Sequence, residues 1–144
     1  RISDVLALKW KNVDCTGEQW HINIIMQKTQ QPLYLPLSMQ ARKWMPERDG
    51  SGEEEAVFST LPCEDTCNVQ IKQWVKEAGI TKHVTYHVSR HTFATMLLTL
   101  GADLYTVCKL LGHTDVKTTQ IYAKIINKKK DDAIGLIDTE FAYT

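Results

Sequence analysis

Three glycines divide the second half of the chain into helix-sized segments. Gly79, Gly101 and Gly112 each follow a run in which apolar residues recur every three or four positions, the spacing that places side chains on one face of an α-helix. Glycine readily adopts the left-handed backbone conformation that commonly ends a helix. The pattern predicts helices over residues 64–78, 85–100 and 103–111, and a further one that starts at Thr114 or Asp115.

Polar residues stand at the start of two of these segments. The side-chain oxygens of Thr85 and Asp103 are suited to accept hydrogen bonds from the first amides of a helix, which have no partner within it. We therefore expect helix starts at both positions. The helix after Thr85 has a predicted apolar stripe of Phe93, Met96, Leu97 and Leu100. The helix after Asp103 has a predicted buried side of Leu104, Val107, Leu110 and Leu111.

The first half of the chain predicts a β-hairpin. Residues 21–26 and 33–37 are rich in side chains that favour strands, and a polar stretch that begins at Lys28 connects them. Lys28 is therefore expected near the tip of the hairpin. Pro32 and Pro36 have no backbone donor, which restricts the second strand to an edge of the sheet.

Shorter elements flank the hairpin. We expect one helix over residues 3–10, with Ser3 or Asp4 as its cap, and another over residues 38–45. Residues 49–55 combine turn formers with like charges and have no apolar face, which predicts an exposed loop. With the helices of the second half, these segments predict an α+β fold that is mainly helical and contains a small antiparallel sheet.

The composition suits one soluble globular domain. Hydrophobic residues make up 43% of the 144 residues and charged residues 24%. No stretch approaches the roughly 18 apolar residues of a membrane helix. The four cysteines lack a paired CxxC framework, so we expect reduced thiols. Cys63 and Cys67 with His83 or His87 form an alternative zinc set, which the lack of a second close cysteine pair disfavours.

The formal net charge of zero conceals an uneven distribution. Residues 80–130 contain eight Lys or Arg and two Asp or Glu, residues 1–79 contain nine and eleven, and residues 131–144 contain none and four. A local excess of six positive charges suits a surface that faces nucleic-acid phosphates. A solvated basic face explains the charge alone equally well.

Three chemically active side chains share the start of the helix after Thr85. His87, Arg90 and His91 are spaced i, i+3 and i+4, so they project from one face. The amide end of a helix attracts phosphate, and a guanidinium offers a planar fork of donors that matches two phosphate oxygens. A lone His-x-x-Arg is more often a surface pair, so its meaning depends on the rest of the chain.

Six residues in order along the chain resemble the tyrosine recombinase, or phage integrase, family. The pattern is an Arg that opens a helix, a Lys on a β-hairpin, a His-x-x-Arg pair, a His after a Leu-Gly turn and a Tyr nine residues later. Its members here are Arg1, Lys28, His87, Arg90, His113 and Tyr122. The resemblance covers the whole chain, is strongest over residues 86–122, and points to a mobile-element or phage-type integrase.

The resemblance implies how a DNA phosphate is held and attacked. Arg1 and Arg90 would clamp the scissile phosphate, with His113 as a further hydrogen-bond donor. Tyr122 would attack the phosphorus and form a 3′-phosphotyrosyl bond. Fixed guanidinium groups stabilise the negative charge that an in-line displacement spreads over the phosphate oxygens, so no metal or other cofactor is implied.

Four more residues have implied supporting roles. Lys28 would protonate the departing 5′ oxygen, and His87 would accept the tyrosine proton. Asp4 would hold Arg1 in place. His91 is expected to be a structural hydrogen-bonding residue.

The resemblance also sets expectations for the whole protein. We expect residues 1–144 to be most of a C-terminal catalytic domain, truncated at its N-terminal side and lacking the N-terminal core-binding domain. The expected partner is double-stranded DNA, bound by a homotetramer on two duplexes, in the bacterial cytoplasm at the nucleoid and away from any membrane. The segment after Tyr122 is expected to pack against a neighbouring subunit through its Lys128–Lys130 run and through Ile134, Leu136 and Ile137.

Two other functions fit part of the pattern. The glycine-separated helices are similar to a helix-turn-helix, so a non-catalytic DNA-binding module would explain the basic stretch. A type IB topoisomerase would share the nucleophile and the arginine clamp but would relax supercoils. Individual residues also have structural explanations: Tyr122 beside Ile121 fits a core aromatic, and His113 fits the end of a helix.

Overall fold

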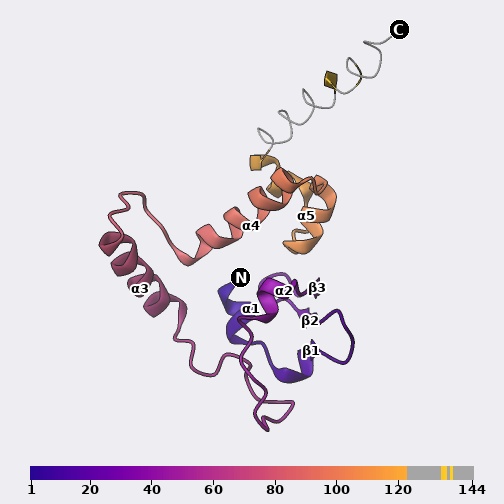
Figure 1. Cartoon of the computed structure of the whole chain (residues 1–144), viewed down its shortest axis with the longest axis vertical. Coiled ribbons are helices and arrows are strands. Elements are labelled where there is room, and N and C mark those ends of the chain that lie inside the picture. The colour runs from indigo at the N-terminus through magenta and orange to yellow at the C-terminus, as the bar shows by residue number, and fades with distance from the viewer. Residues whose placement is uncertain (123–133, 136, 138–144) are drawn as a thin grey trace. The chain divides into compact units, whose positions relative to one another are not determined.

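The computed structural model describes residues 1–122, 134, 135 and 137, and it divides into two compact units. The first unit is Arg1–Arg90 and the second is His91–Thr144. Figure 1 follows the elements along the chain. Helix α4, Tyr86–Leu100, starts in the first unit and continues into the second. Each unit is described by itself below.

The first unit contains the small sheet. Strands β1 (Val13–Asp14), β2 (His21–Ile25) and β3 (Pro32–Pro36) are antiparallel, in the order β1-β2-β3. The predicted hairpin is confirmed to within one residue at each strand end. Strand β3 lies at an edge, as its two prolines require. The two-residue strand β1 was not predicted, because so short a segment carries no alternating pattern.

A compact apolar cluster underlies this sheet. Its buried members come from β1, β2, the short 3₁₀-helix before β1 and the loops around them: Leu8, Trp10, Val13, Ile22, Leu37 and Val57. Helix α2, Met39–Arg42, starts at Ser38, whose hydroxyl accepts a hydrogen bond from the Ala41 amide at 3.1 Å. It is shorter than the predicted helix over residues 38–45.

The start of the chain differs from the prediction. Helix α1 covers only Ile2–Leu6, and the 3₁₀-helix η1 follows at Trp10–Asn12. Neither Ser3 nor Asp4 caps α1, because the helix begins directly after Arg1 without a side-chain cap. Asp4 is instead a buried residue that accepts a hydrogen bond from the Gln27 amide. Rules for helix caps consider only neighbours along the chain, so they could not predict this bond.

The loop over residues 49–55 is exposed for most of its length, as predicted, but it is fixed to the first unit. The Trp10 amide donates to the Glu55 carbonyl at 3.1 Å. The ammonium groups of Lys9 and Lys11 both reach the Glu54 carboxylate, at 2.9 and 2.7 Å. These two lysines hold the pKa of Glu54 at about 2, below its ordinary value.

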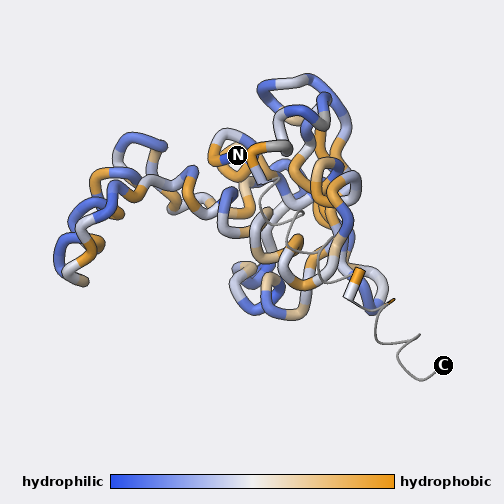
Figure 2. The backbone as a smooth tube through the Cα atoms, turned by 90° about the horizontal axis from the view of Figure 1, so that it is seen from above, coloured by the Kyte–Doolittle hydropathy of each residue, from blue (hydrophilic) through white to orange (hydrophobic). Residues whose placement is uncertain are grey.

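Helix α3, Glu64–Glu77, agrees with the predicted bounds to within one residue. Gly79 follows it with a φ of +68°, the left-handed conformation expected at this helix end. Cys67 and Val75 are its buried residues. Hydrophilic and hydrophobic residues alternate along its tube in Figure 2.

In the second unit, α4 packs with α5 (Leu104–Leu110) and the 3₁₀-helix η2 (Val116–Tyr122). The buried cluster is Ala94, Leu98, Val107, Leu111 and Tyr122. The stripe predicted for α4 is wrong in part, since Met96 is 50% and Leu100 76% exposed. The buried face of the helix is centred on Ala94 and Leu98, because the position of the neighbouring elements, and not the size of its side chains, selects that face.

The predicted ends of α5 are confirmed. The Asp103 carboxylate accepts a hydrogen bond from the Thr106 amide at 2.9 Å, and Gly112 has a φ of +61°. Asp115 starts the next helix by accepting from the Lys117 amide at 2.8 Å. That helix is of the 3₁₀ type. In the described part of the chain, no helix has the length and hydropathy of a membrane span.

Candidate active site

The candidate site residues divide between the two units. Arg1, Lys28, His87 and Arg90 belong to the first unit, whereas His91, His113 and Tyr122 belong to the second. Helix α4 carries members of both sets. Asp4, expected to hold Arg1, lies in the first unit.

Asp4 connects helix α1 to the hairpin turn. Its side chain is 8% exposed, and one carboxylate oxygen accepts a hydrogen bond from the Gln27 amide at 2.7 Å. The other carboxylate oxygen lies 3.5 Å from the amino group of Arg1. Gln27 immediately precedes Lys28, so one buried carboxylate holds both the start of α1 and the turn that carries the lysine.

Arg1 and Arg90 influence each other electrostatically. The pKa of the Arg1 amino group is lowered, chiefly by burial, and the positive charge of Arg90 adds to that lowering while Asp4 opposes it. The Arg1 guanidinium also lies 3.9 Å from the Met26 sulfur, at the end of strand β2.

Lys28 is exposed in the turn between β2 and β3. The turn is closed on both sides, because the Met26 amide donates to the Gln31 carbonyl and the Gln30 amide donates to the Met26 carbonyl, each at 2.9 Å. Gln30 has a φ of +52°, a left-handed conformation uncommon for a residue other than glycine. The backbone of the turn thus fixes where the flexible side chain of Lys28 begins.

A residue that sequence reasoning missed holds the start of α4. The Asn68 side chain, on α3, accepts a hydrogen bond from the Tyr86 amide at 2.8 Å. Tyr86 is the first residue of α4 and directly precedes His87. One of the otherwise unpaired amides at this helix end is therefore satisfied by a different helix. The position of Asn68 in its sequence carries no local signal for this role.

Hydrogen bonds within the second unit hold His113 in place. Its amide donates to the Cys108 carbonyl at 3.0 Å, in the turn that ends α5. Its ring nitrogen Nδ1 lies 3.0 Å from the hydroxyl of Thr119. Thr119 is completely buried, so its hydroxyl is a fixed partner for the imidazole. Thr119 is a second residue that the sequence pattern did not single out.

The hydroxyl of Tyr122 lies 2.7 Å from Nδ1 of His91. The two rings are tilted by 59°, with centroids 6.0 Å apart. Tyr122 is only 7% exposed and its ring belongs to the core cluster of the second unit, as the alternative of a core aromatic requires. His91 was expected to make a structural hydrogen bond, and its partner is the predicted nucleophile.

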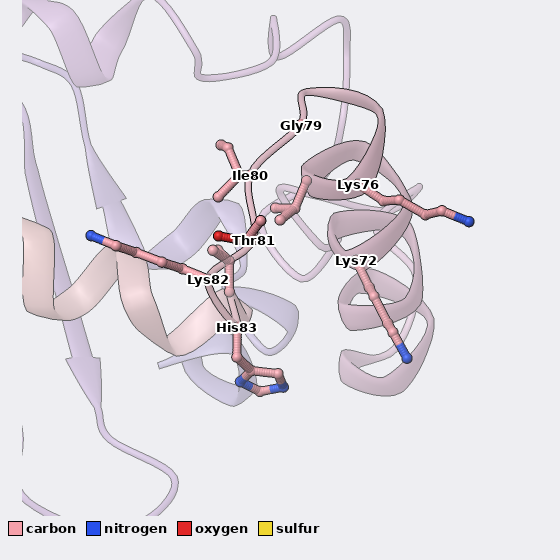
Figure 3. A pocket seen from close by; sticks show the side chains of 9 residues that line it. Lys72, Lys76, Gly79, Ile80, Thr81, Lys82 and His83 are labelled. Carbon is pink, nitrogen blue, oxygen red and sulfur yellow. The ribbon is translucent and has the colours of Figure 1, made fainter.

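A hollow of about 470 Å³ lies where α3 meets the segment that leads to α4. Its lining includes apolar Val75, Ile80 and Val84 and the basic residues Lys72, Lys76 and Lys82. Figure 3 shows the ammonium groups of Lys76 and Lys82 extending to opposite sides. The hollow therefore does not concentrate their charge, and we do not assign it to the candidate site.

The zinc alternative has no support among the described residues, where no group of three or more His, Cys, Asp or Glu is placed to hold a metal ion. Cys63 is exposed and Cys67 is buried, and both are free thiols.

Comparison with known proteins finds one family. The model of the phage integrase family matches residues 1–129. Tyrosine recombinase XerC of Xylella fastidiosa is 33% identical over 133 residues, which cover 87% of this chain and 44% of that protein. Tyrosine recombinase XerD of Lacticaseibacillus casei is 52% identical over 58 residues, which cover 40% of this chain and 20% of that protein. The chain thus spans less than half the length of these curated relatives.

Solved structures show the same fold. The crystal structure of XerA recombinase superposes with a TM-score of 0.71 and 27% identity, over 92% of this chain and 53% of that one. The catalytic domain of bacteriophage HP1 integrase has a TM-score of 0.65 and 19% identity, over 98% of this chain and 76% of that one. The predicted α+β fold, mainly helical with a small antiparallel sheet, is thereby confirmed. The chain belongs to the phage integrase family of tyrosine recombinases.

Proposed function

We propose that this chain is the catalytic part of a site-specific DNA recombinase or integrase. Tyr122 would attack a DNA phosphate and form a 3′-phosphotyrosyl bond, and a 5′ hydroxyl of a second strand would then displace the tyrosine. The covalent bond conserves the energy of the broken phosphodiester, so rejoining needs no ATP.

The observation that carries this proposal is the match of the phage integrase family model to residues 1–129, which include Arg1, Arg90 and Tyr122. Arg1 and Arg90 lie at opposite ends of the first unit's sequence, and both would contact one DNA phosphate. The negative charge of a phosphate would attract both guanidinium groups. Two guanidinium groups can hold several phosphate oxygens and stabilise the charge that develops during displacement.

The other predicted residues have roles that suit their chemistry. His113, fixed by Thr119, would donate a hydrogen bond to the phosphate. Lys28 would protonate the 5′ oxygen as it leaves, and its exposed position in the hairpin turn leaves its side chain room to reach DNA. His87, exposed near the start of α4, is the residue to which the family resemblance assigns the proton of Tyr122, and a different acceptor is proposed below.

The burial of Tyr122 imposes a condition on this mechanism. With 7% of the residue exposed, its hydroxyl can meet a phosphate only at the surface of the second unit. DNA would therefore bind with its scissile phosphate at that surface.

The proposed partner is double-stranded DNA. Structures with the same fold include XerH recombinase bound to its difH substrate, before and after cleavage. We propose a homotetramer on two duplexes, within a longer protein that also has a core-binding domain and the start of the catalytic domain. Most of the segment after Tyr122, including Lys128–Lys130 and Leu136, lies outside the described residues, so its predicted subunit contact stays a prediction.

Two rival functions make different predictions. A non-catalytic DNA-binding module would bind DNA without forming any covalent product. A type IB topoisomerase would form one, but it would relax a supercoiled plasmid and would not join two sites. The local excess of positive charge in residues 80–130 agrees with all three functions, whereas the combination of Arg1, Arg90 and Tyr122 favours an enzyme.

A nicked suicide substrate tests the proposal. The full-length protein would be incubated with a duplex that carries its recombination site and a nick beside the cleavage position, and covalent protein–DNA bands would be separated on a denaturing gel. We expect a band with the wild type and none with Tyr122→Phe. Exchange between two sites on one plasmid then separates a recombinase from a topoisomerase. DNA binding without any covalent band would favour the binding module.

A further inference from the structure

We propose that His91 receives the hydroxyl proton of Tyr122 when this hydroxyl attacks the scissile phosphate. His91 would then be a catalytic residue, and not only a structural one as the sequence suggested. The inference rests on the proposed function, and it names a different proton acceptor from His87.

The geometry is that of a nucleophile and its base. The Tyr122 hydroxyl and the His91 Nδ1 are 2.7 Å apart, within the roughly 2.6–3.2 Å at which a base activates a nucleophile. A phenol with an ordinary pKa near ~10 is almost entirely protonated at neutral pH. Histidine is the side chain that most often acts as a general base in enzymes.

The surrounding packing fixes both partners. Tyr122 packs in the cluster that contains Ala94 and Leu98, one and two turns beyond His91 on the same helix, α4. The packing that buries the phenol ring therefore also sets its distance from the imidazole. Both residues belong to the second unit, so their bond is formed within one compact body. His87, the acceptor implied by the family resemblance, belongs to the first.

The proton and the bonds balance in each direction. During cleavage the Tyr122 O–H bond breaks, its proton moves to His91 Nδ1, the Tyr122 oxygen bonds to phosphorus, and the bond from phosphorus to the 5′ oxygen breaks. Lys28 would supply the proton that the 5′ oxygen takes up. During rejoining the 5′ hydroxyl attacks phosphorus, its proton returns to Lys28, and His91 gives its proton back to the departing tyrosine oxygen.

Two substitutions separate proton transfer from positioning. In His91→Asn the side-chain amide retains a hydrogen-bonding group near the place of Nδ1 but cannot act as a base. His91→Ala removes the ring and leaves space for free imidazole. The full-length protein would be assayed for single-turnover cleavage of the nicked suicide substrate, with DNA binding measured by gel shift. The control is His21→Asn, because His21 stacks on Tyr34 in the hairpin at 4.8 Å and lies outside the proposed site.

If His91 takes the proton, both variants bind DNA normally but cleave it about 10²-fold more slowly or worse. Added imidazole restores part of the cleavage by His91→Ala and none of that by Tyr122→Phe, and His21→Asn behaves as the wild type. Rapid cleavage by His91→Asn would overturn the inference, and so would a failure of imidazole to rescue His91→Ala. If the wild type forms no band that depends on Tyr122, the proposed function fails too. If a Tyr122-dependent band forms at the same rate in the His91 variants as in the wild type, this inference is refuted and the proposed function stands.

Discussion

The Asn68 side chain, on α3, accepts the amide hydrogen of Tyr86, the first residue of α4, at 2.8 Å. This bond crosses between two helices and ends one residue before His87. Since free amides at a helix start need partners, the orientation of the first turn of α4 depends on α3.

Substitution of Asn68 tests this dependence. Asn68→Leu leaves the partly buried Tyr86 amide without its partner, and we expect a loss of roughly 1–3 kcal/mol in the free energy of unfolding. Asn68→Asp retains an acceptor and places a negative charge at a helix N-terminus, so it should be close to the wild type. Urea unfolding measures the stability, and hydrogen exchange at Tyr86 reports the bond itself. Equal stability of Asn68→Leu and the wild type would contradict this account.

Asp4 offers a second test, at the turn that carries Lys28. Asp4→Ala removes the acceptor of the Gln27 amide, and we expect faster hydrogen exchange at Gln27 together with a loss of about 1–3 kcal/mol. Asp4→Asn retains an oxygen that can accept this bond and should lose less. Asp14→Ala is a matched control, because Asp14 lies on β1 and bonds only locally to Thr16 in the described structure. Unaltered exchange at Gln27 in Asp4→Ala would show that the turn is held by other contacts.

Thr119 is expected to act through His113. Thr119→Val preserves the shape of this buried side chain but removes the hydroxyl 3.0 Å from the imidazole. We expect DNA cleavage to slow by about tenfold, because a catalytic group whose orienting bond is lost spends less time in its productive position. Thr118→Val is the control, since Thr118 is exposed on the same helix. If both variants cleave at the wild-type rate, Thr119 does not position His113.

The Asp103 cap of α5 should make the stability of the protein depend on pH. Hydrogen bonds from the Thr106 hydroxyl and amide lower the pKa of the Asp103 carboxyl. A carboxyl whose pKa is lower in the folded state adds stability above its unfolded value, near ~3.9, and loses it as the pH falls through the folded value. Melting temperatures measured between pH 6 and pH 2.5 should fall less steeply for Asp103→Asn, which caps without ionising. Parallel curves for the two proteins would count against this contribution.

The sequence predicted elements better than it predicted contacts. Alternation and turn residues located the hairpin and placed Lys28 in its turn, and Gly79 and Gly112 marked helix ends, because these signals depend on neighbours along the chain. The bond between His91 and Tyr122 joins two helices and depends on how they pack. Periodicity gives the repeat of a helix but not the partner of each face, which is also why Met96 was expected inside and lies half exposed.

Rules for helix caps also failed where a polar side chain bonds to a residue far along the chain. Asp4 has the side chain and position of a helix cap, but its carboxylate accepts from Gln27 in the hairpin turn. Asn68 carries no signal at all in the sequence, since an Asn on a helix usually faces water. Both residues support the site by contacts that only the tertiary structure specifies.

The most direct test of the central claim is to locate the covalent bond. The full-length protein would be trapped on the nicked suicide substrate, digested with nuclease and protease, and its peptides analysed by mass spectrometry. The account predicts a nucleotide attached through phosphate to the peptide that contains Tyr122, and no adduct in Tyr122→Phe. An adduct on any other residue, or cleavage by Tyr122→Phe, would contradict it.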